Sequence, residues 1–417
     1  MSRSCDFLVY GATGFTGRQT AAEMLLRARK YGFKLGIGGR SADKLAAVCQ
    51  TIGASEGEVV CFVADAQDRA ALDRMIRATR VILNTAGPFS IYAPLIYELC
   101  VEHRTDYLDI TGETAFVRRM IDLHHENARQ REVRLVPFAG FDSVPSDLGT
   151  FHHFLEWQKQ YGPDKPLEHV VGLFEGRGGI NGGSLASAVE MVESGDFAVA
   201  QQTDLLCDRF KPKQAPDWTK PRWNATLRTW TAPFIMAPIN TRIVRRAQSF
   251  FATESGDLAR LSELLYEEGF LFKEKLPLKS TLMTFILGAS TLFLGMGWSR
   301  RLLRKLLPAP GVGPTEKQMD GGFARTTFVG SGGGAVLVTR YSDVGDPGNR
   351  VTVRIFCECA LLLGLPDERA QLPPVYGLLP PSYLFREHLI ERLRAVGAKF
   401  ETLETPAPRL ASGPPKH

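Results

Sequence analysis

The sequence predicts an α/β protein in which a doubly wound parallel sheet is joined to a second, α+β domain. Three observations support this fold class. The chain has 417 residues, more than a typical single domain, and 44% of them are hydrophobic. Short apolar runs alternate with helical stretches over the first third, and strand patterns return near the end. We therefore expect a first domain over residues 1–145 and a second over residues 146–375.

Six apolar runs are the expected strands of the parallel sheet. The segments between them carry helix signals, such as Ser41 as an N-cap and Gly53 as a stop on either side of ADKLAAVCQTI. This order of strands and helices is typical of a Rossmann-type domain. The six runs lie at residues 7–11, 34–39, 59–64, 80–86, 107–111 and 134–139.

A glycine-rich loop follows the first expected strand and opens a helical run. Its glycines, spaced as GxxGxxG, allow a tight turn, a close approach of the backbone to a ligand and close packing of the helix on the strand. The N-terminus of that helix would then point at a pyrophosphate. We therefore expect a dinucleotide to bind along the loop, at Gly11, Thr13, Gly14, Phe15, Thr16 and Gly17.

The end of the second strand indicates which dinucleotide binds. An NAD site would place Asp or Glu there for the ribose hydroxyls, whereas this chain has Arg40 and Ser41, with Lys44 one turn later. Cations beside a hydroxyl suit a 2′-phosphate, so NADP(H) is favoured over NAD(H). Asp65, which ends the third strand, is placed for the adenine.

The fourth strand ends in small residues, Ala86, Gly87 and Pro88, that would let the backbone pass the ribose on the nicotinamide side. Ordinary turn chemistry explains Gly87-Pro88 equally well. Tyr92, which follows this loop, is a candidate for donating a proton or orienting a substrate. The alternative is that Tyr92 packs as an aromatic residue at the start of a helix.

Two later segments could build a substrate site. The first, 140–149, lies at the carboxyl edge of the sheet and holds Asp142, a second candidate proton donor, and Ser143. A corner between domains, capped by these side chains, is the structural alternative. The second segment is a glycine-rich loop, and simple flexibility would explain it as well. It leads into a helix through Gly182, Gly183 and Ser184.

Several motifs together resemble those of the saccharopine dehydrogenase-like oxidoreductases, and within them the trans-acting enoyl reductase subfamily. They are GATGFTG, GGRSADKL, LNTAGPFSIYAPLI, YLDITGE, GFDSVPSDLG and GGINGGSLAS. The resemblance runs over nearly the whole chain and implies that the α+β domain is inserted in the Rossmann domain. It also implies reduction of lipid or polyketide-type acyl chains in glycolipid synthesis, with the cofactor on Gly11, Thr13, Gly14, Phe15, Thr16, Arg40, Ser41 and Lys44.

An uncharged stretch at residues 281–298 lies between two groups of basic residues. It is at the short end for a bilayer span, and its basic flanks suit a helix that lies in the interface with anionic headgroups. A helix buried in a homodimer, or one that covers an acyl pocket, is the alternative. The basic flanks are Lys273, Lys275 and Lys279 before the stretch and Arg300, Arg301, Arg304 and Lys305 after it.

The net charge of +5 is unevenly distributed. Residues 209–246 carry nine Lys and Arg against one Asp, and residues 273–305 carry seven against one Glu, so the rest of the chain is acidic. The first of these segments also holds Trp218, Trp223 and Trp230 and shows little helical or strand periodicity. We expect it to meet a membrane surface or to cover a substrate, and we do not expect nucleic acid as a partner.

The last part of the chain predicts strands at 326–330, 335–343 and 350–364. An amphipathic helix is expected within 376–404, and the family resemblance implies that it packs back on the first domain. Residues 405–417 are expected to form a flexible tail. The seven scattered cysteines and a strand directly at the N-terminus suggest a cytoplasmic protein, with a peripheral place on a membrane as one option. The adjacent histidine pairs lack metal-ligand spacing, so no metal is expected.

Together these features predict an NADP(H)-dependent oxidoreductase, similar to an enoyl reductase, that acts on an apolar or lipid-linked small molecule. Two alternatives stay open from the sequence. One is an amino-acid reductase of the saccharopine type. The other is a dinucleotide-binding protein without turnover that associates with a membrane.

Overall fold

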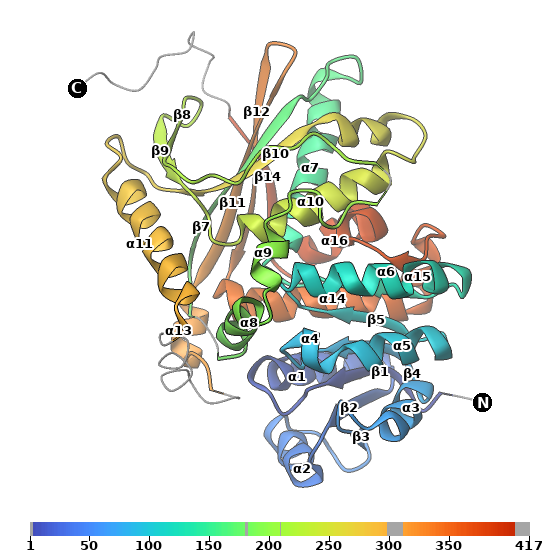
Figure 1. Ribbon diagram of the computed structural model, residues 1–417. Helices are drawn as coiled ribbons and strands as arrows, with labels where there is room; N and C mark the ends of the chain where they lie inside the picture. Colours follow the sequence, from blue (N-terminus) through green and yellow to red (C-terminus); the bar gives the residue numbers. More distant parts are fainter. Residues whose placement is uncertain (1–2, 180–181, 209, 298–311, 405–417) are drawn as a thin grey trace.

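The computed structural model describes residues 3–179, 182–208, 210–297 and 312–404 (Figure 1). Within these ranges the chain forms two seven-stranded sheets, both accompanied by helices. The tail expected to be flexible, 405–417, lies outside the described residues, as do Trp298 and the basic cluster from Arg300 to Lys305.

The first sheet is parallel and has the strand order β13-β6-β5-β4-β1-β2-β3. The six strands expected from the sequence are confirmed, and a seventh comes from near the C-terminus. Because Val9 pairs with Ile37 of β2 and with Leu83 of β4, the carboxyl ends of these strands meet at one edge. The bounds are β1 (Cys5–Tyr10), β2 (Leu35–Gly39), β3 (Val59–Val63), β4 (Thr79–Asn84), β5 (Asp106–Asp109), β6 (Arg134–Val136) and β13 (Gly377–Leu378).

Helices cover both faces of the first sheet. Phe7 and Val9 of β1 point into the core on the side of α1 (Phe15–Tyr31), α2 (Ala42–Thr51) and α14 (Thr352–Gly364). Leu8 and Tyr10 point into the opposite core, on the side of α3 (Arg69–Arg77), α5 (Pro94–His103) and α6 (Thr114–Gln130). Since successive residues of a strand face opposite sides, the continuous apolar run of β1 follows from burial on both faces.

The second sheet is mixed and has the order β14-β12-β11-β7-β10-β9-β8. β7 and β10 are parallel neighbours, and the other pairs are antiparallel. Its strands are β7 (His169–Arg177), β8 (Arg222–Asn224), β9 (Thr229–Ala232), β10 (Leu265–Leu271), β11 (Phe323–Gly332), β12 (Ala335–Val344) and β14 (Lys399–Leu403).

Three helices lie between the two sheets in the middle of the molecule (Figure 1). These are α7 (Val144–Tyr161), α10 (Ala237–Phe251) and α16 (Pro381–Ala395), and all three pack against strands of the second sheet. α16 also packs against α14, so the two layers share one core. The remaining helices are α4 (Phe89–Tyr92), α8 (Gly182–Glu193), α9 (Asp196–Ala200), α11 (Leu278–Gly295), α13 (Glu316–Asp320) and α15 (Pro366–Gln371), with a 3₁₀-helix at Asp257–Glu263 and a π-helical turn at Pro347–Val351.

The strand expected at 350–364 is wrong, because this segment is the helix α14. Every residue of α14 except Arg354 is buried. A continuous apolar run fits a buried helix as well as a buried strand, and here the run packs against α1 and β4. This part of the segment 146–375, which we expected to belong to the second domain, therefore packs on the first sheet.

The segment 376–404 holds more than the expected helix. β13 joins the first sheet beside β6, α16 follows, and β14 joins the second sheet beside β12. The chain thus returns to the first sheet after the whole second sheet except β14 has formed, which is the topology of an insertion.

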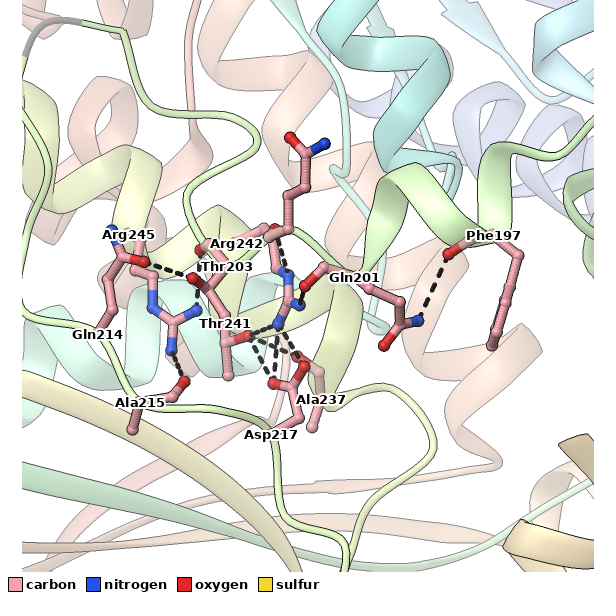
Figure 2. A network of polar contacts seen from close by, with 11 residues as sticks. Phe197, Gln201, Thr203, Gln214, Ala215, Asp217, Ala237, Thr241, Arg242 and Arg245 are labelled. Carbon is pink, nitrogen blue, oxygen red and sulfur yellow. Dashed lines mark hydrogen bonds and ion pairs between the residues drawn. The ribbon is translucent and has the colours of Figure 1, made fainter.

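The expectation of a surface-facing, irregular basic segment at 209–246 is wrong in part. Its last ten residues lie in α10, where Arg242, Arg245 and Arg246 are only 0%, 1% and 2% exposed. Figure 2 shows how the first two hold the loop that crosses α10: Arg242 binds Asp217 at 2.6 Å, and Arg245 donates to the carbonyl oxygens of Thr203 and Ala215. The carbonyl and carboxylate oxygens replace the water that these cations lose on burial.

α11 lies at the outer edge of the molecule, where it contacts β9 and α8 (Figure 1). Within the described residues it is the one helix long and apolar enough to cross a membrane by length and composition. Only 6% of it is buried in the fold. The helix predicted from the uncharged stretch is therefore present, and most of its side chains face outward.

Candidate functional site

The glycine loop forms a tight cradle between β1 and α1. Gly11 has φ of +81°, a conformation that only glycine adopts without strain. A Cβ on Gly11 would lie 2.8 Å from the backbone nitrogen of Ala86, and one on Gly17 would lie 2.2 Å from the carbonyl oxygen of Gly11. The loop is therefore packed against the end of β4 as closely as the backbone allows.

The first turn of α1 offers free backbone donors to a ligand. Gly14 is the N-cap residue and provides no side-chain acceptor, so the N–H groups of Phe15, Thr16 and Gly17 keep no partner within the helix. Thr13 precedes them and is partly buried. This arrangement of a glycine loop and a helix N-terminus fits a pyrophosphate.

The end of β2 presents cations, as the sequence predicted. Arg40 and Lys44 are exposed, while Ser41 caps α2 by accepting a hydrogen bond from the Lys44 backbone N–H at 3.4 Å. Asp65 is exposed after β3, and its carboxylate accepts from the backbone N–H of Gln67. These positions along β2 and β3 leave Arg40 and Lys44 free to bind a 2′-phosphate.

A buried carboxylate that was not identified from the sequence, Glu113, binds the loop after β4. Glu113, which is 1% exposed, accepts hydrogen bonds from the backbone N–H groups of Phe89 and Ser90, each at 2.8 Å. These bonds fix the N-terminus of α4, directly after Ala86, Gly87 and Pro88. The Gly87-Pro88 peptide bond is cis. Glu113 lies in the motif YLDITGE, which was the available signal in the sequence.

Glu113 also links the cofactor loop to the second domain. The hydroxyl of Ser187 on α8 donates to Glu113 at 2.9 Å, and a Cβ on Gly87 would lie 3.6 Å from the same hydroxyl oxygen. Gly182 and Gly183 form the start of α8, and the side chain of Ser184 lies outside the described residues. Ser187, which was not singled out from the sequence, is thus the described side chain of α8 that contacts Glu113.

Asp142 follows β6 at the same edge of the first sheet. It is partly buried, and among the described residues its carboxylate has no hydrogen-bond partner. Desolvation raises the pKa of Asp142 to about 6, well above the ordinary value near 4. A carboxyl group with this pKa is partly protonated near neutral pH and can donate a proton.

Ser143 and Ser146, from the same motif, belong to a buried polar network. Ser143, the N-cap of α7, donates to the side-chain oxygen of Asn240 at 3.5 Å. Ser146 donates to Glu268 at 2.5 Å, and Asn240 donates to the same carboxyl oxygen at 3.2 Å. In the part of the chain that the structure describes, the other oxygen of Glu268 has no hydrogen-bond partner, and burial raises the pKa of Glu268 to about 7. Glu268 was not identified from the sequence.

Tyr92 lies at a different part of the edge from this network. It ends α4 and is partly buried. Burial raises the pKa of Tyr10 above its usual range, and the nearby Asp65 and Tyr92 add to the shift. Among the described residues no hydrogen bond joins Tyr92 to Asp142.

A row of aromatic side chains begins beside Asp142. The rings of Phe141 and Phe174 have centroids 5.7 Å apart. Phe174 in turn stacks on Phe234 at 4.8 Å and meets Phe270 of β10 at 5.6 Å. Phe141 is buried, whereas Phe174 and Phe234 are partly buried, so the row leads from the core beside Asp142 to partly exposed rings at the second sheet.

Comparisons with known proteins support an NADP-binding first domain. Residues 7–136 match the family model of the saccharopine dehydrogenase NADP binding domain. A protein of Mycobacterium tuberculosis (strain ATCC 25618 / H37Rv) named as a trans-acting enoyl reductase is 32% identical, over 96% of this chain and 98% of its own. The trans-acting enoyl reductase of Mycobacterium leprae (strain TN) is 31% identical over the same shares.

A solved structure also aligns over nearly the whole chain. Saccharopine dehydrogenase (L-Glu forming) from Saccharomyces cerevisiae, in its apo form, is 12% identical, with 95% of this chain and 99% of that chain covered at a TM-score of 0.49. The full-length sequence similarity, together with a glycine cradle that fits NADP(H), settles the family. The chain belongs to the saccharopine dehydrogenase-like family of NADP(H)-binding oxidoreductases, together with the trans-acting enoyl reductases.

Proposed function

We propose that this protein uses NADPH to reduce the carbon–carbon double bond of an apolar acyl chain, of the lipid-linked or polyketide type. Relatives named as trans-acting enoyl reductases, at 30% and 32% identity over 96% of the chain, support this reaction class. The aromatic row that starts beside Asp142 supports the apolar nature of the substrate.

The aromatic row is the observation that carries the proposal. Phe141 is buried in the core beside Asp142, and its ring packs towards the partly buried rings of Phe174 and Phe234, which supply apolar area close to this carboxylate. An acyl chain laid along such a surface is stabilised by about 0.8 kcal/mol for each buried CH₂ group. A small diacid would instead require several cations close to Asp142.

The residues of this chain have distinct roles in the proposed reaction. NADPH, when bound, supplies the hydride that adds to the β-carbon of the enoyl group. Asp142 donates the proton that the α-carbon needs, because its raised pKa keeps the carboxyl partly protonated. Glu113 positions the loop at Gly87 and the helix α8 relative to each other through Phe89, Ser90 and Ser187.

The proposed setting is lipid or glycolipid metabolism in the cytoplasm, at or near a membrane surface. The outward-facing, uncharged helix α11 supports this placement. Ser143 and the start of α8 at Gly182, Gly183 and Ser184 stay candidates for binding the polar end of the substrate.

A series of substrates tests the proposal. Purified protein is mixed with NADPH and with trans-2-enoyl thioesters of short and long chain, and NADPH absorbance is followed. We expect kcat/KM to rise at least ~10-fold from the short to the long chain, because added methylenes are buried along the aromatic row. Oxidation of NADPH only with a keto acid and an amino acid would favour a saccharopine-type reductase. Binding of NADPH without oxidation by any enoyl, keto or imine substrate would favour a protein without turnover.

A further inference from the structure

Helix α11 has two different faces. Its inner face contacts β9 and α8 and holds Ser280, the one residue of the helix that is buried. Its outer face is a stripe of apolar side chains at a spacing of three and four residues, which places them above one another on a helix. The large members are Leu278, Leu282, Phe285 and Leu292, which are 71%, 59%, 72% and 75% exposed.

An apolar stripe of this length is expected to be covered by another molecule. Ala289 continues it with the same spacing, and Ile286, 49% exposed, lies beside it. Soluble proteins rarely leave such a continuous apolar surface in water, and where they do it marks a contact with another molecule or a membrane.

The residues beside the stripe distinguish a lipid surface from a second copy of the chain. No charged residue occurs between Ser280 and Gly297. Helices that pair in water carry charged residues next to the apolar seam, where they set the register and keep the free helix soluble. Here the neighbours of the stripe are Thr281, Gly288 and Ile286, and these uncharged residues suit the boundary between headgroups and acyl chains.

The attachment of α11 to the fold determines how it can lie. Its 18 residues span about 27 Å at 1.5 Å for each residue, close to the thickness of the hydrocarbon layer. A spanning helix would have to leave its contacts with β9 and α8, whereas a helix parallel to the bilayer keeps them. The geometry therefore favours a helix that lies flat with its outer stripe in the boundary.

Charge at the start of the helix fits an anionic surface. Lys275 and Lys279 are exposed, and among the described residues neither pairs with an acidic side chain. Lys273 lies 3.5 Å from Glu175 yet remains 75% exposed. Ammonium groups next to an inserted apolar stripe bind anionic headgroups.

From these observations we propose that the outer stripe of α11 inserts into the surface of an anionic bilayer and places the candidate substrate site beside the membrane. α8, which contacts α11, carries the Ser187 that binds Glu113 at the cofactor edge. In this arrangement the bilayer contacts α11, and α11 contacts α8, the helix that borders the candidate substrate site. That it delivers the acyl substrate rests on the proposed function, whereas membrane binding itself does not.

Vesicle binding tests the proposal. The full-length protein is sedimented with vesicles of phosphatidylcholine alone or mixed with phosphatidylglycerol. We expect binding to the mixed vesicles, a loss of at least ~10-fold in the partition coefficient for Leu282→Glu/Phe285→Glu, and no change for the control Leu123→Glu, an equally exposed leucine (62%) on α6. Lys275→Gln/Lys279→Gln should weaken binding to the anionic vesicles only, as added salt should.

NADPH affinity and oligomeric state are also measured for the wild type and for each variant. NADPH affinity, unchanged in all variants, shows that each one is folded. Absence of binding by the wild type, or equal binding by Leu282→Glu/Phe285→Glu, overturns the proposal. A wild-type dimer that becomes a monomer in the same variant overturns it in favour of a second copy. If the protein binds vesicles but reduces no enoyl thioester, the proposed function is wrong, whereas the proposed membrane contact of α11 is supported.

Discussion

At the scale of single residues, the cofactor cradle depends on positions where a side chain has no room. The close approach of Gly17 to the Gly11 carbonyl oxygen, and of Gly11 to Ala86, joins β1, α1 and the end of β4 into one rigid loop. The free N–H groups of α1 keep their direction only while this packing persists. We therefore expect the affinity for a pyrophosphate to depend on atoms that do not touch it.

Replacement of Gly17 tests this dependence. In Gly17→Ala the new Cβ would lie 2.2 Å from the Gly11 carbonyl oxygen, so the loop must move. We expect NADPH to bind at least ~10-fold more weakly by fluorescence titration, because displacement of a close-packed backbone costs about 1–3 kcal/mol. Gly288→Ala, on α11 with no atom within 4 Å of the new Cβ, is the control and should bind NADPH normally.

The two exposed cations after β2 should determine the preference for NADPH over NADH. In Arg40→Ala/Lys44→Ala the 2′-phosphate loses its charge-assisted hydrogen bonds, which contribute about 1.5–3 kcal/mol. We expect the dissociation constant for NADPH to rise ~10- to 100-fold and that for NADH to stay within about twofold. Equal losses for both dinucleotides would show that these residues bind a shared part of the cofactor.

Asp142 should govern the pH dependence of turnover. Its pKa of about 6 means that the protonated form, the one that donates, is lost as the pH rises through that value. We expect kcat/KM of the wild type to fall above pH 6, and Asp142→Asn to lose about 100-fold and to show no such fall. Tyr92→Phe is the parallel variant. Full turnover in both variants would refute both assignments.

At the scale of elements, α10 shows how buried charge holds an irregular segment. The guanidinium groups of Arg242, Arg245 and Arg246 bind carbonyl oxygens between residues 201 and 215, and Asp217 balances one of the charges. Figure 2 shows the contacts of Arg242 and Arg245. A loop without regular hydrogen bonds thus obtains its partners from side chains of a helix. Its order depends on arginines, whose fixed fork of donors reaches several acceptors at once.

Loss of Arg242 should destabilise the fold more than loss of a surface arginine. Arg242→Met leaves Asp217, which is 17% exposed, without its partner, so we expect the free energy of unfolding to fall by about 3 kcal/mol. Arg69→Met removes an exposed ion pair with Glu98 and should change it by less than ~1 kcal/mol. Urea denaturation measures both. Similar effects for the two variants would mean that water solvates Arg242 in the native protein.

The elements that sequence reasoning misassigned share one physical cause. The run VTVRIFCECALLLG is apolar on every side because α14 is buried on every side, and without a clear period it fits a strand or a helix. Likewise, a count of charges cannot tell Arg242 in a core from Arg40 at a surface. The parallel strands and the cofactor loop were predictable because their signals are local.

At the scale of the whole molecule, the site joins segments that the sequence keeps far apart. Ser187 and Glu113 are separated by 74 residues and Ser146 and Glu268 by 122, so no local pattern could reveal either contact. The return of the chain to the first sheet through α14 and β13 brings both sheets around one core. The position of the candidate site thus depends on the complete fold.

Buried carboxyl groups in both layers should make global stability depend on pH. The pKa of Glu268 is raised from 4.5 to about 7, so the native state keeps a proton that the unfolded chain releases. The free energy of unfolding is therefore highest below the pKa that Glu268 has in the unfolded chain. It decreases by about 3 kcal/mol as the pH rises towards 7. Glu268→Gln cannot ionise. Relative to the wild type, it should gain about this amount between pH 4.5 and pH 8 in urea denaturation, and parallel pH profiles would contradict the assignment.

Isotopic labelling of the transferred hydride tests whether NADPH reduces an enoyl group on this protein. The protein is incubated with NADPH that carries deuterium at C4 and with a long-chain trans-2-enoyl thioester, and the product is analysed by mass spectrometry and NMR. We expect a saturated thioester with one deuterium at the β-carbon, delivered from one face of the nicotinamide only. A saturated product without deuterium, or NADPH that stays unoxidised while bound, would contradict this expectation.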